Sequence, residues 1–101
     1  MSDLVNPRRS ERQPVTLAVQ CRTLSGMRDT GEISDITAEG CCLRTRSLFF
    51  RPGTRLIVKP QGMEGMSGVV RWVRGDQSGI EFDRALYGPI VDFIAQQNRA
   101  V

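Results

Sequence analysis

Arginines in the leader of this chain are the first residues that could do chemistry. Arg8, Arg9 and Arg12 lie in a polar segment with prolines at both ends. The planar guanidinium group carries five donors in a rigid fork, which suits phosphates and guanine edges better than a lysine ammonium does. The alternative is a solvated arm whose charges only keep it in water, and the cluster taken alone favours that alternative.

A second polar motif, DITAEG at 35–40, joins two predicted strands. Asp35 could accept hydrogen bonds from guanine N1–H and N2–H2, Thr37 could bond a phosphate, and Gly40 could let a ligand approach the backbone. The alternative is a plain connection in which Asp35 and Thr37 cap the turn and Gly40 adopts a positive φ. The motif alone favours this second interpretation.

Catalysis and metal binding find little support in the composition. The chain has no histidine, which removes Ser-His and Cys-His nucleophilic catalysis. Three thiols, Cys21, Cys41 and Cys42, do not complete an ordinary four-ligand zinc site. We therefore predict three small, buried or half-buried apolar residues, no metal, no cofactor and no enzyme activity.

The elements that must position these residues are predicted to be strands. Apolar residues alternate in 15–22, with Val15, Leu17, Val19 and Cys21 on one face. Further strands are predicted at 29–36, 41–46, 54–60, 66–75 and 78–83. Short strands at about ten-residue spacing, separated by turn signals, are typical of a small antiparallel barrel or sandwich.

Two aromatic positions depend on this strand and helix assignment. In 66–75, strict alternation places Trp72 on the same face as Val70, as a half-buried barrel aromatic, with base stacking as the alternative. Residues 88–100 instead show helical spacing, with Pro89 suited to the first turn. We expect Ile90, Phe93 and Ile94 of this helix to pack on the barrel.

Size and charge indicate one small domain. The 101 residues are 40% hydrophobic and 25% charged, with a net charge of +3. No apolar run reaches the roughly 20 residues that span a bilayer, and the first residues lack a secretory signal, so we expect a cytoplasmic protein without membrane insertion. We predict a flexible arm at 1–13 and a barrel with its helix at 14–101.

Taken in order, the motifs resemble the PilZ domain family. An Arg-x-x-x-Arg arm (Arg8 and Arg12) precedes a strand and then Asp-x-Thr-x-x-Gly (Asp35, Thr37 and Gly40). GVVRWV at 68–73 and SGIEF at 78–82 resemble the late hairpin of that family, so the resemblance covers about 8–98. It implies an all-β, six-stranded antiparallel barrel with a C-terminal helix. It also implies binding of cyclic di-GMP, a bacterial second messenger.

The same resemblance implies roles for individual residues. Arg8 and Arg12 would hold guanine edges and phosphates, and Arg9 would be an auxiliary phosphate contact. Asp35 would read the Watson–Crick edge of a guanine. Thr37, where the family usually has serine, would bond a phosphate or a polar neighbour.

The expected function is therefore a cyclic di-GMP receptor that orders its arm on binding and relays the signal to a downstream protein partner. Gly40 would complete its site by permitting the turn. One alternative, motivated by Thr37, is a PilZ-fold protein-interaction module that has lost nucleotide binding. Another is a barrel that binds single-stranded RNA or DNA, but only 6% of the residues are aromatic, so we expect no nucleic acid partner.

Overall fold

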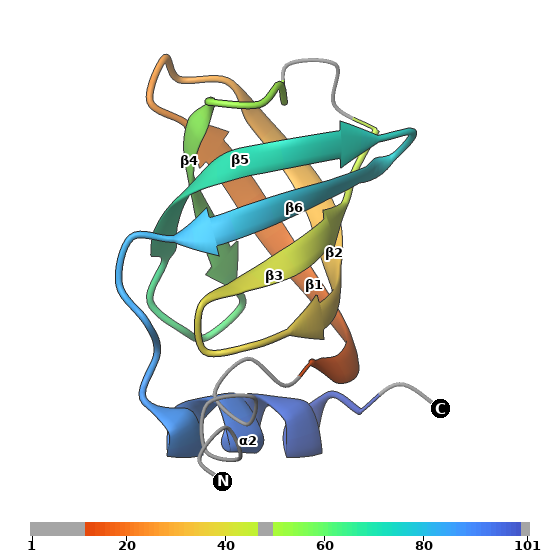
Figure 1. The fold of residues 1–101 in the computed structure, drawn as a ribbon, viewed down its shortest axis with the longest axis vertical. Coiled ribbons are helices and arrows are strands. Elements are labelled where there is room, and N and C mark those ends of the chain that lie inside the picture. The colour runs from red at the N-terminus through yellow and green to blue at the C-terminus, as the bar shows by residue number, and fades with distance from the viewer. Residues whose placement is uncertain (1–11, 47–49, 100–101) are drawn as a thin grey trace, which may run out of the picture.

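The computed structural model describes residues 12–46 and 50–99, which form a closed antiparallel barrel followed by one helix (Figure 1). The elements are β1 (Gln13–Thr23), β2 (Arg28–Ile36), β3 (Gly40–Arg44), β4 (Arg55–Pro60), β5 (Met66–Arg74), β6 (Gln77–Phe82) and α2 (Gly88–Gln97). The predicted six-stranded barrel with a C-terminal helix is confirmed. Most of the predicted arm, including Arg8 and Arg9, lies outside the described residues.

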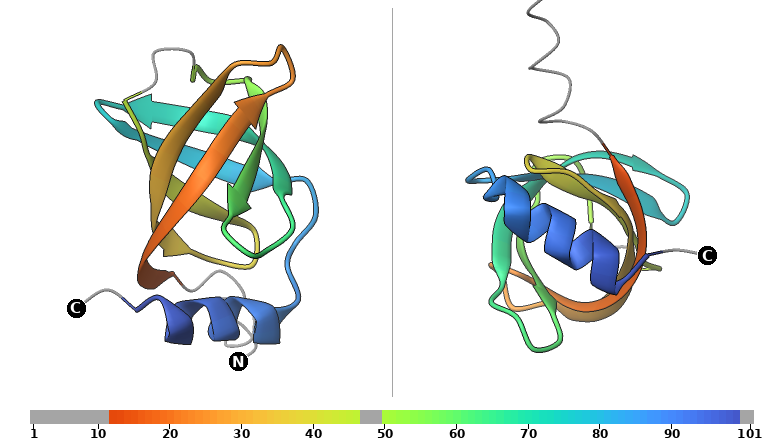
Figure 2. Two further views of the ribbon diagram at one scale, coloured as in Figure 1. Left: turned by 180° about the vertical axis from the view of Figure 1, so that it is seen from behind. Right: turned by 90° about the horizontal axis from the view of Figure 1, so that it is seen from below.

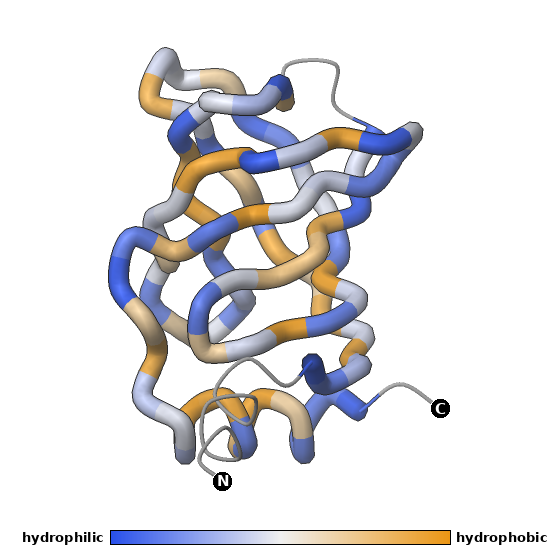
Figure 3. Tube along the Cα trace, viewed as in Figure 1, coloured by the Kyte–Doolittle hydropathy of each residue, from blue (hydrophilic) through white to orange (hydrophobic). Residues whose placement is uncertain are grey.

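The strands follow the order β1-β2-β3-β6-β5-β4 around the barrel, and β1 pairs with β4 to close it. Closure leaves every strand hydrogen-bonded on both sides. β1 is the longest strand, and its predicted alternation is confirmed because Val15, Leu17, Val19 and Cys21 are all buried. Figure 3 shows how apolar and polar residues alternate along the strands.

β-bulges interrupt the alternation in two strands that border the same face. In β2, a register shift between Ile33 and Asp35 lets Ile33 and Ile36 both point into the core, fully buried, while Asp35 points outward. In β5, a shift between Val70 and Trp72 keeps Val70 in the core and turns Trp72 to the outer surface. A bulge adds one residue to a strand and so reverses the faces beyond it. The predicted half-burial of Trp72 is confirmed, but its predicted face is wrong.

The helix α2 lies across one end of the barrel (Figure 2). Val91, Ile94 and Ala95 are its buried residues, whereas Ile90 and Phe93 are 44% and 60% exposed. The prediction is right for Ile94 and wrong for Ile90 and Phe93. Backbone hydrogen bonds hold both ends of this segment, from Leu86 N to Ala38 O at 2.7 Å and from Thr16 N to Asn98 O at 2.8 Å. These attachments fix which side of the helix faces the core. In the described ranges, no helix is long and apolar enough to cross a membrane.

Candidate functional site

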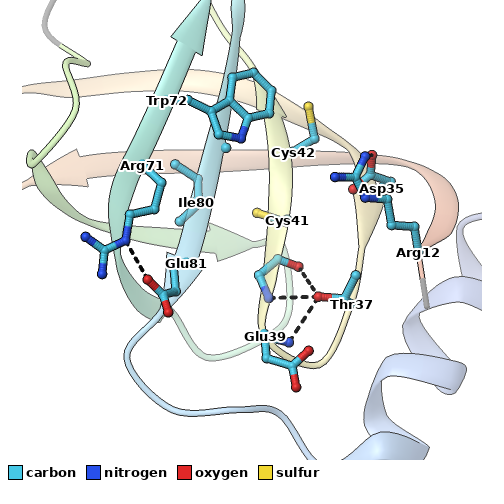
Figure 4. A pocket seen from close by; sticks show the side chains of 12 residues that line it. Arg12, Asp35, Thr37, Glu39, Cys41, Cys42, Arg71, Trp72, Ile80 and Glu81 are labelled. Carbon is cyan, nitrogen blue, oxygen red and sulfur yellow. Dashed lines mark hydrogen bonds and ion pairs between the residues drawn. The ribbon is translucent and has the colours of Figure 1, made fainter. Parts of the chain in front are cut away.

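A cleft of about 230 Å³ lies on the outer surface of β2, β3, β5 and β6 (Figure 4). The predicted residues that line it are Arg12, Asp35, Thr37 and Gly40. The lining residues not included in the predicted site are Glu39, Cys41, Cys42, Arg71, Trp72, Gly79, Ile80 and Glu81. The structure therefore brings Arg12, the described residue of the leader, to the DITAEG motif.

The cleft is built on one row of outward-facing residues that crosses four strands. Asp35 of β2 pairs with Cys42 of β3, Cys42 pairs with Gly79 of β6, and Gly79 pairs with Trp72 of β5. We call this set the cleft row. Its two middle positions carry small side chains, whereas a carboxylate and an indole stand at its ends. The result is a shallow depression between an acceptor and an aromatic group.

Asp35 and Arg12 meet because of the pairing between β1 and β2. Pro14 is the register partner of Asp35, and Arg12 lies just before β1. Arg12 Nη1 is 3.9 Å from Asp35 Oδ2, with the two side chains 71% and 25% exposed. Exposed ion pairs contribute about 0–1 kcal/mol to stability. Arg12 and Asp35 can therefore separate at little cost, and each can then bind a ligand.

Thr37 uses its hydroxyl inside the turn between β2 and β3. Its Oγ1 accepts hydrogen bonds from the backbone N–H groups of Glu39 and Gly40, both at 3.0 Å. The same hydroxyl donates to the carbonyl oxygen of Gly40 at 3.3 Å. Of the two interpretations of the motif, turn capping describes Thr37 in this structure. Its expected contact with a phosphate stays a prediction.

Gly40 is required for a reason other than the one expected. Its φ is not positive, so that part of the turn-capping interpretation is wrong. A Cβ at Gly40 would instead collide with the backbone carbonyl oxygen of Ile80 on the neighbouring β6. The close approach is therefore between two strands of the barrel. It lets β3 and β6 pair directly beside the turn.

Trp72 lies against the backbone of Gly79, which explains the glycine. A Cβ at Gly79 would overlap the indole ring, so a larger residue would push Trp72 away. The guanidinium carbon of Arg74 is also 5.3 Å from the centre of the ring, within the range of a cation–π contact. Together these neighbours hold the aromatic plane at the end of the cleft row.

Charges of both signs surround the cleft. Arg71, the bulge residue of β5, forms an ion pair with Glu81 across the strands, and both side chains are more than half exposed. Arg71 and Arg12 thus provide cations at opposite sides of the cleft (Figure 4). Sequence reasoning missed Arg71, because nothing in the alternation signals a bulge there.

The three cysteines, of which Cys41 and Cys42 line the cleft, are buried thiols, as predicted. Burial raises the pKa of Cys21 to about 12, and the nearby Asp29 adds to the effect. Burial also raises the pKa of Cys41, with further contributions from Cys21, Cys42 and Asp35. Because a thiol must lose its proton to act as a nucleophile, neither Cys21 nor Cys41 is activated at neutral pH.

Comparisons with known proteins agree with this architecture. The model of the PilZ domain family matches residues 6–96. A similar solved structure is described as the PilZ domain of CeSA from a cellulose-synthesizing bacterium. It has a TM-score of 0.63 and 16% identity, over 87% of this chain and 93% of that one. No curated protein sequence gives a significant match. The chain belongs to the PilZ domain family, which is known for cyclic di-GMP receptors and consists of binding modules.

Proposed function

We propose that this domain is a receptor for cyclic di-GMP that carries out no reaction. The observation that supports it is the cleft row, which offers a carboxylate at one end and an aromatic plane at the other. A guanine base presents a hydrogen-bonding edge and a flat face, so it matches both groups. Such a receptor would meet its ligand in the cytoplasm and pass the signal to a downstream protein partner.

Asp35 is the group that would recognise the guanine edge. Its carboxylate accepts from N1–H and N2–H2, and hydrogen bonds to a charged group contribute about 1.5–3 kcal/mol each. Its ion pair with Arg12 is long and exposed, so replacing it costs little. Trp72 would stack on a base, a contact that contributes about 1–3 kcal/mol.

Arginines would neutralise the two phosphates. Arg12 is largely exposed at the rim, and Arg71 could exchange Glu81 for a phosphate oxygen. Arg8 and Arg9 would add further guanidinium groups from the predicted arm. Charge-assisted hydrogen bonds between arginine and phosphate are short and often bidentate, which favours arginine in all four positions.

The size of the cleft supports a role for the arm. Pockets that enclose a small molecule usually measure about 300–1,000 Å³, more than the 230 Å³ found here. A cyclic dinucleotide would extend beyond the cleft, where the leader could cover it. Ordering a flexible segment costs about 1–2 kcal/mol per residue, so the leader would close only when the ligand supplies contacts.

Thr37 would support the site by shaping the turn that follows Asp35. A serine hydroxyl could form the same three hydrogen bonds that Thr37 forms here. The replacement of the usual serine therefore keeps the turn. This weakens the main reason for regarding the domain as an interaction module that has lost its nucleotide.

Isothermal titration calorimetry with cyclic di-GMP tests the proposal. We expect saturable binding by the native protein and little heat from Asp35→Ala, with both proteins shown to be folded by circular dichroism. Absence of heat from the folded native protein at high micromolar ligand would contradict the proposal. It would favour the interaction module, whose partner should bind equally well with and without the dinucleotide.

A further inference from the structure

A second depression, of about 530 Å³, is lined by residues of β1, β2 and β4. Figure 2 (left) shows these three strands from behind the view of Figure 1. Among the described residues, the depression and the cleft have no lining residue in common. The lining of the depression includes three cations, Arg22, Arg28 and Lys59. We call this depression the basic hollow. One carboxylate, Asp29, also lines the depression and accepts hydrogen bonds from Thr30 N at 2.7 Å and Thr45 Oγ1 at 3.5 Å.

The strand register places two of these cations side by side. Arg22 and Arg28 are direct partners across β1 and β2, and Lys59 pairs with Gln20 in the next outward row. Like charges directly opposite each other on neighbouring strands are destabilising. Within residues 12–46 and 50–99, none of the three cations forms an ion pair. The fold thus holds two like charges opposite each other, and no described carboxylate forms an ion pair with either of them.

Apolar groups accompany this charge. Ile57 of β4 lines the hollow and is the register partner of Arg22. The hairpin between Arg22 and Arg28 carries Leu24 and Met27, which are 71% and 38% exposed. This hairpin lies at the end of the barrel opposite α2 (Figure 1). The surface therefore offers cations next to exposed apolar side chains.

We infer that the basic hollow binds an acidic, partly apolar segment of a partner protein. Charge complementarity selects an anion, and a concave site beside exposed Leu24 and Met27 suits carboxylates interspersed with apolar side chains. None of the described residues that line the hollow is aromatic, so this lining lacks the stacking groups typical of single-stranded nucleic acid sites. The inference rests on the proposed receptor function. It specifies that the downstream partner is acidic and that it binds at a surface separate from the nucleotide cleft.

Peptide selection tests the inference without the dinucleotide. A random-peptide phage library would be panned against the native protein and against Arg28→Glu, and selected peptides titrated by fluorescence anisotropy. We expect peptides rich in Asp and Glu with apolar neighbours, which bind in a salt-dependent way and lose about tenfold or more in affinity to Arg28→Glu. Arg28→Glu should also raise the midpoint of thermal unfolding, because it replaces a repulsive cross-strand pair by an attractive one.

Two control variants separate binding in the basic hollow from a general effect of net charge and from binding in the nucleotide cleft. Arg84→Gln/Arg99→Gln changes the net charge by the same two units at exposed positions outside the hollow, and should keep peptide binding. Asp35→Ala should also keep it, even if nucleotide binding is lost, so the two proposals can fail separately. Equal losses in the Arg84/Arg99 variant and in Arg28→Glu would overturn the inference.

Other classes of partner are tested with the same variants. Sedimentation with phosphatidylserine vesicles and anisotropy with a labelled single-stranded oligonucleotide should show weaker binding than the selected peptides. The inference would be overturned by Arg28-dependent binding to either of these probes in the absence of acidic peptides. It would equally be overturned by selected peptides that are not acidic.

Discussion

The turn between β2 and β3 and the cleft row beside it both take residues from the DITAEG motif but use their polar groups differently. In the turn, the hydroxyl of Thr37 is engaged by backbone groups, and Gly40 exists to let β6 approach. In the cleft row, the contact of Asp35 with Arg12 is long, and Trp72 exposes part of its ring to the cleft. Thr37 and Gly40 therefore maintain the fold of the site, whereas Asp35 and Trp72 are available to a ligand.

This difference separates effects on stability from effects on binding. A substitution in the turn should change folding first and binding only as a consequence. A substitution at the ends of the cleft row should change binding while leaving the fold nearly intact. The following variants test that separation, from the largest expected effect to the smallest.

Gly40→Ala should have the largest effect, a loss of about 3 kcal/mol or more in the free energy of unfolding. The added Cβ would collide with the carbonyl oxygen of Ile80, which is backbone and has little freedom to move. Urea unfolding followed by circular dichroism measures this. Gly88→Ala is the matched control, because a Cβ there meets nothing within 4 Å. Equal stability of the two variants would show that the close approach is unimportant.

Asp35→Ala should weaken cyclic di-GMP binding roughly 100-fold, the loss of two charge-assisted hydrogen bonds at about 1.5 kcal/mol each. Its stability should fall by no more than about 1 kcal/mol, since the ion pair with Arg12 is exposed. Calorimetric titration and urea unfolding of one preparation give both values. If Asp35→Ala were unfolded, Asp35 would be a residue that maintains the fold, like Thr37 and Gly40.

Thr37→Val should lower the free energy of unfolding by about 1–3 kcal/mol, because two backbone N–H groups of the turn lose their acceptor. Thr37→Ser keeps the hydroxyl and should remain close to the native value. Thermal unfolding of Thr37→Val and Thr37→Ser measures this difference in stability. If Thr37→Val were as stable as Thr37→Ser but failed to bind the dinucleotide, the hydroxyl would belong to the ligand site.

Trp72→Ala should weaken dinucleotide binding about tenfold, the lower part of the range for one stacked base. Gly79→Ala should act in the same direction with the indole still present, because its methyl group would displace the ring. Competition titrations with a fluorescent analogue of cyclic di-GMP would rank the two. Unchanged affinity in both variants would remove Trp72 from the site.

Sequence reasoning recovered the elements of the fold because their signals are local. The alternation of Val15, Leu17, Val19 and Cys21 follows from one buried strand face, and the turn residues mark where strands end. Helical spacing also located α2. The helical spacing could not show whether the buried side of α2 contains Ile90 or Val91. Contacts with the barrel fix the rotation of the helix about its axis.

The site was less predictable because two bulges create it. Alternation assigns Trp72 to the face of Val70, and only the register shift in β5 turns it to the outer face that also carries Asp35. The reason for Gly40 is likewise invisible in the chain, since Ile80 is distant in sequence. The family resemblance supplied Arg12 and Asp35, while Arg71, Gly79 and the position of Trp72 required the structure.

Fluorescence of Trp72 is the most direct test of the central claim, because it is the only tryptophan in the chain and lines the cleft. Titration with cyclic di-GMP should change its emission in a saturable way in the native protein, and should do so only at far higher ligand concentration in folded Asp35→Ala. Emission that stays constant while calorimetry reports binding would place the ligand elsewhere and contradict the account.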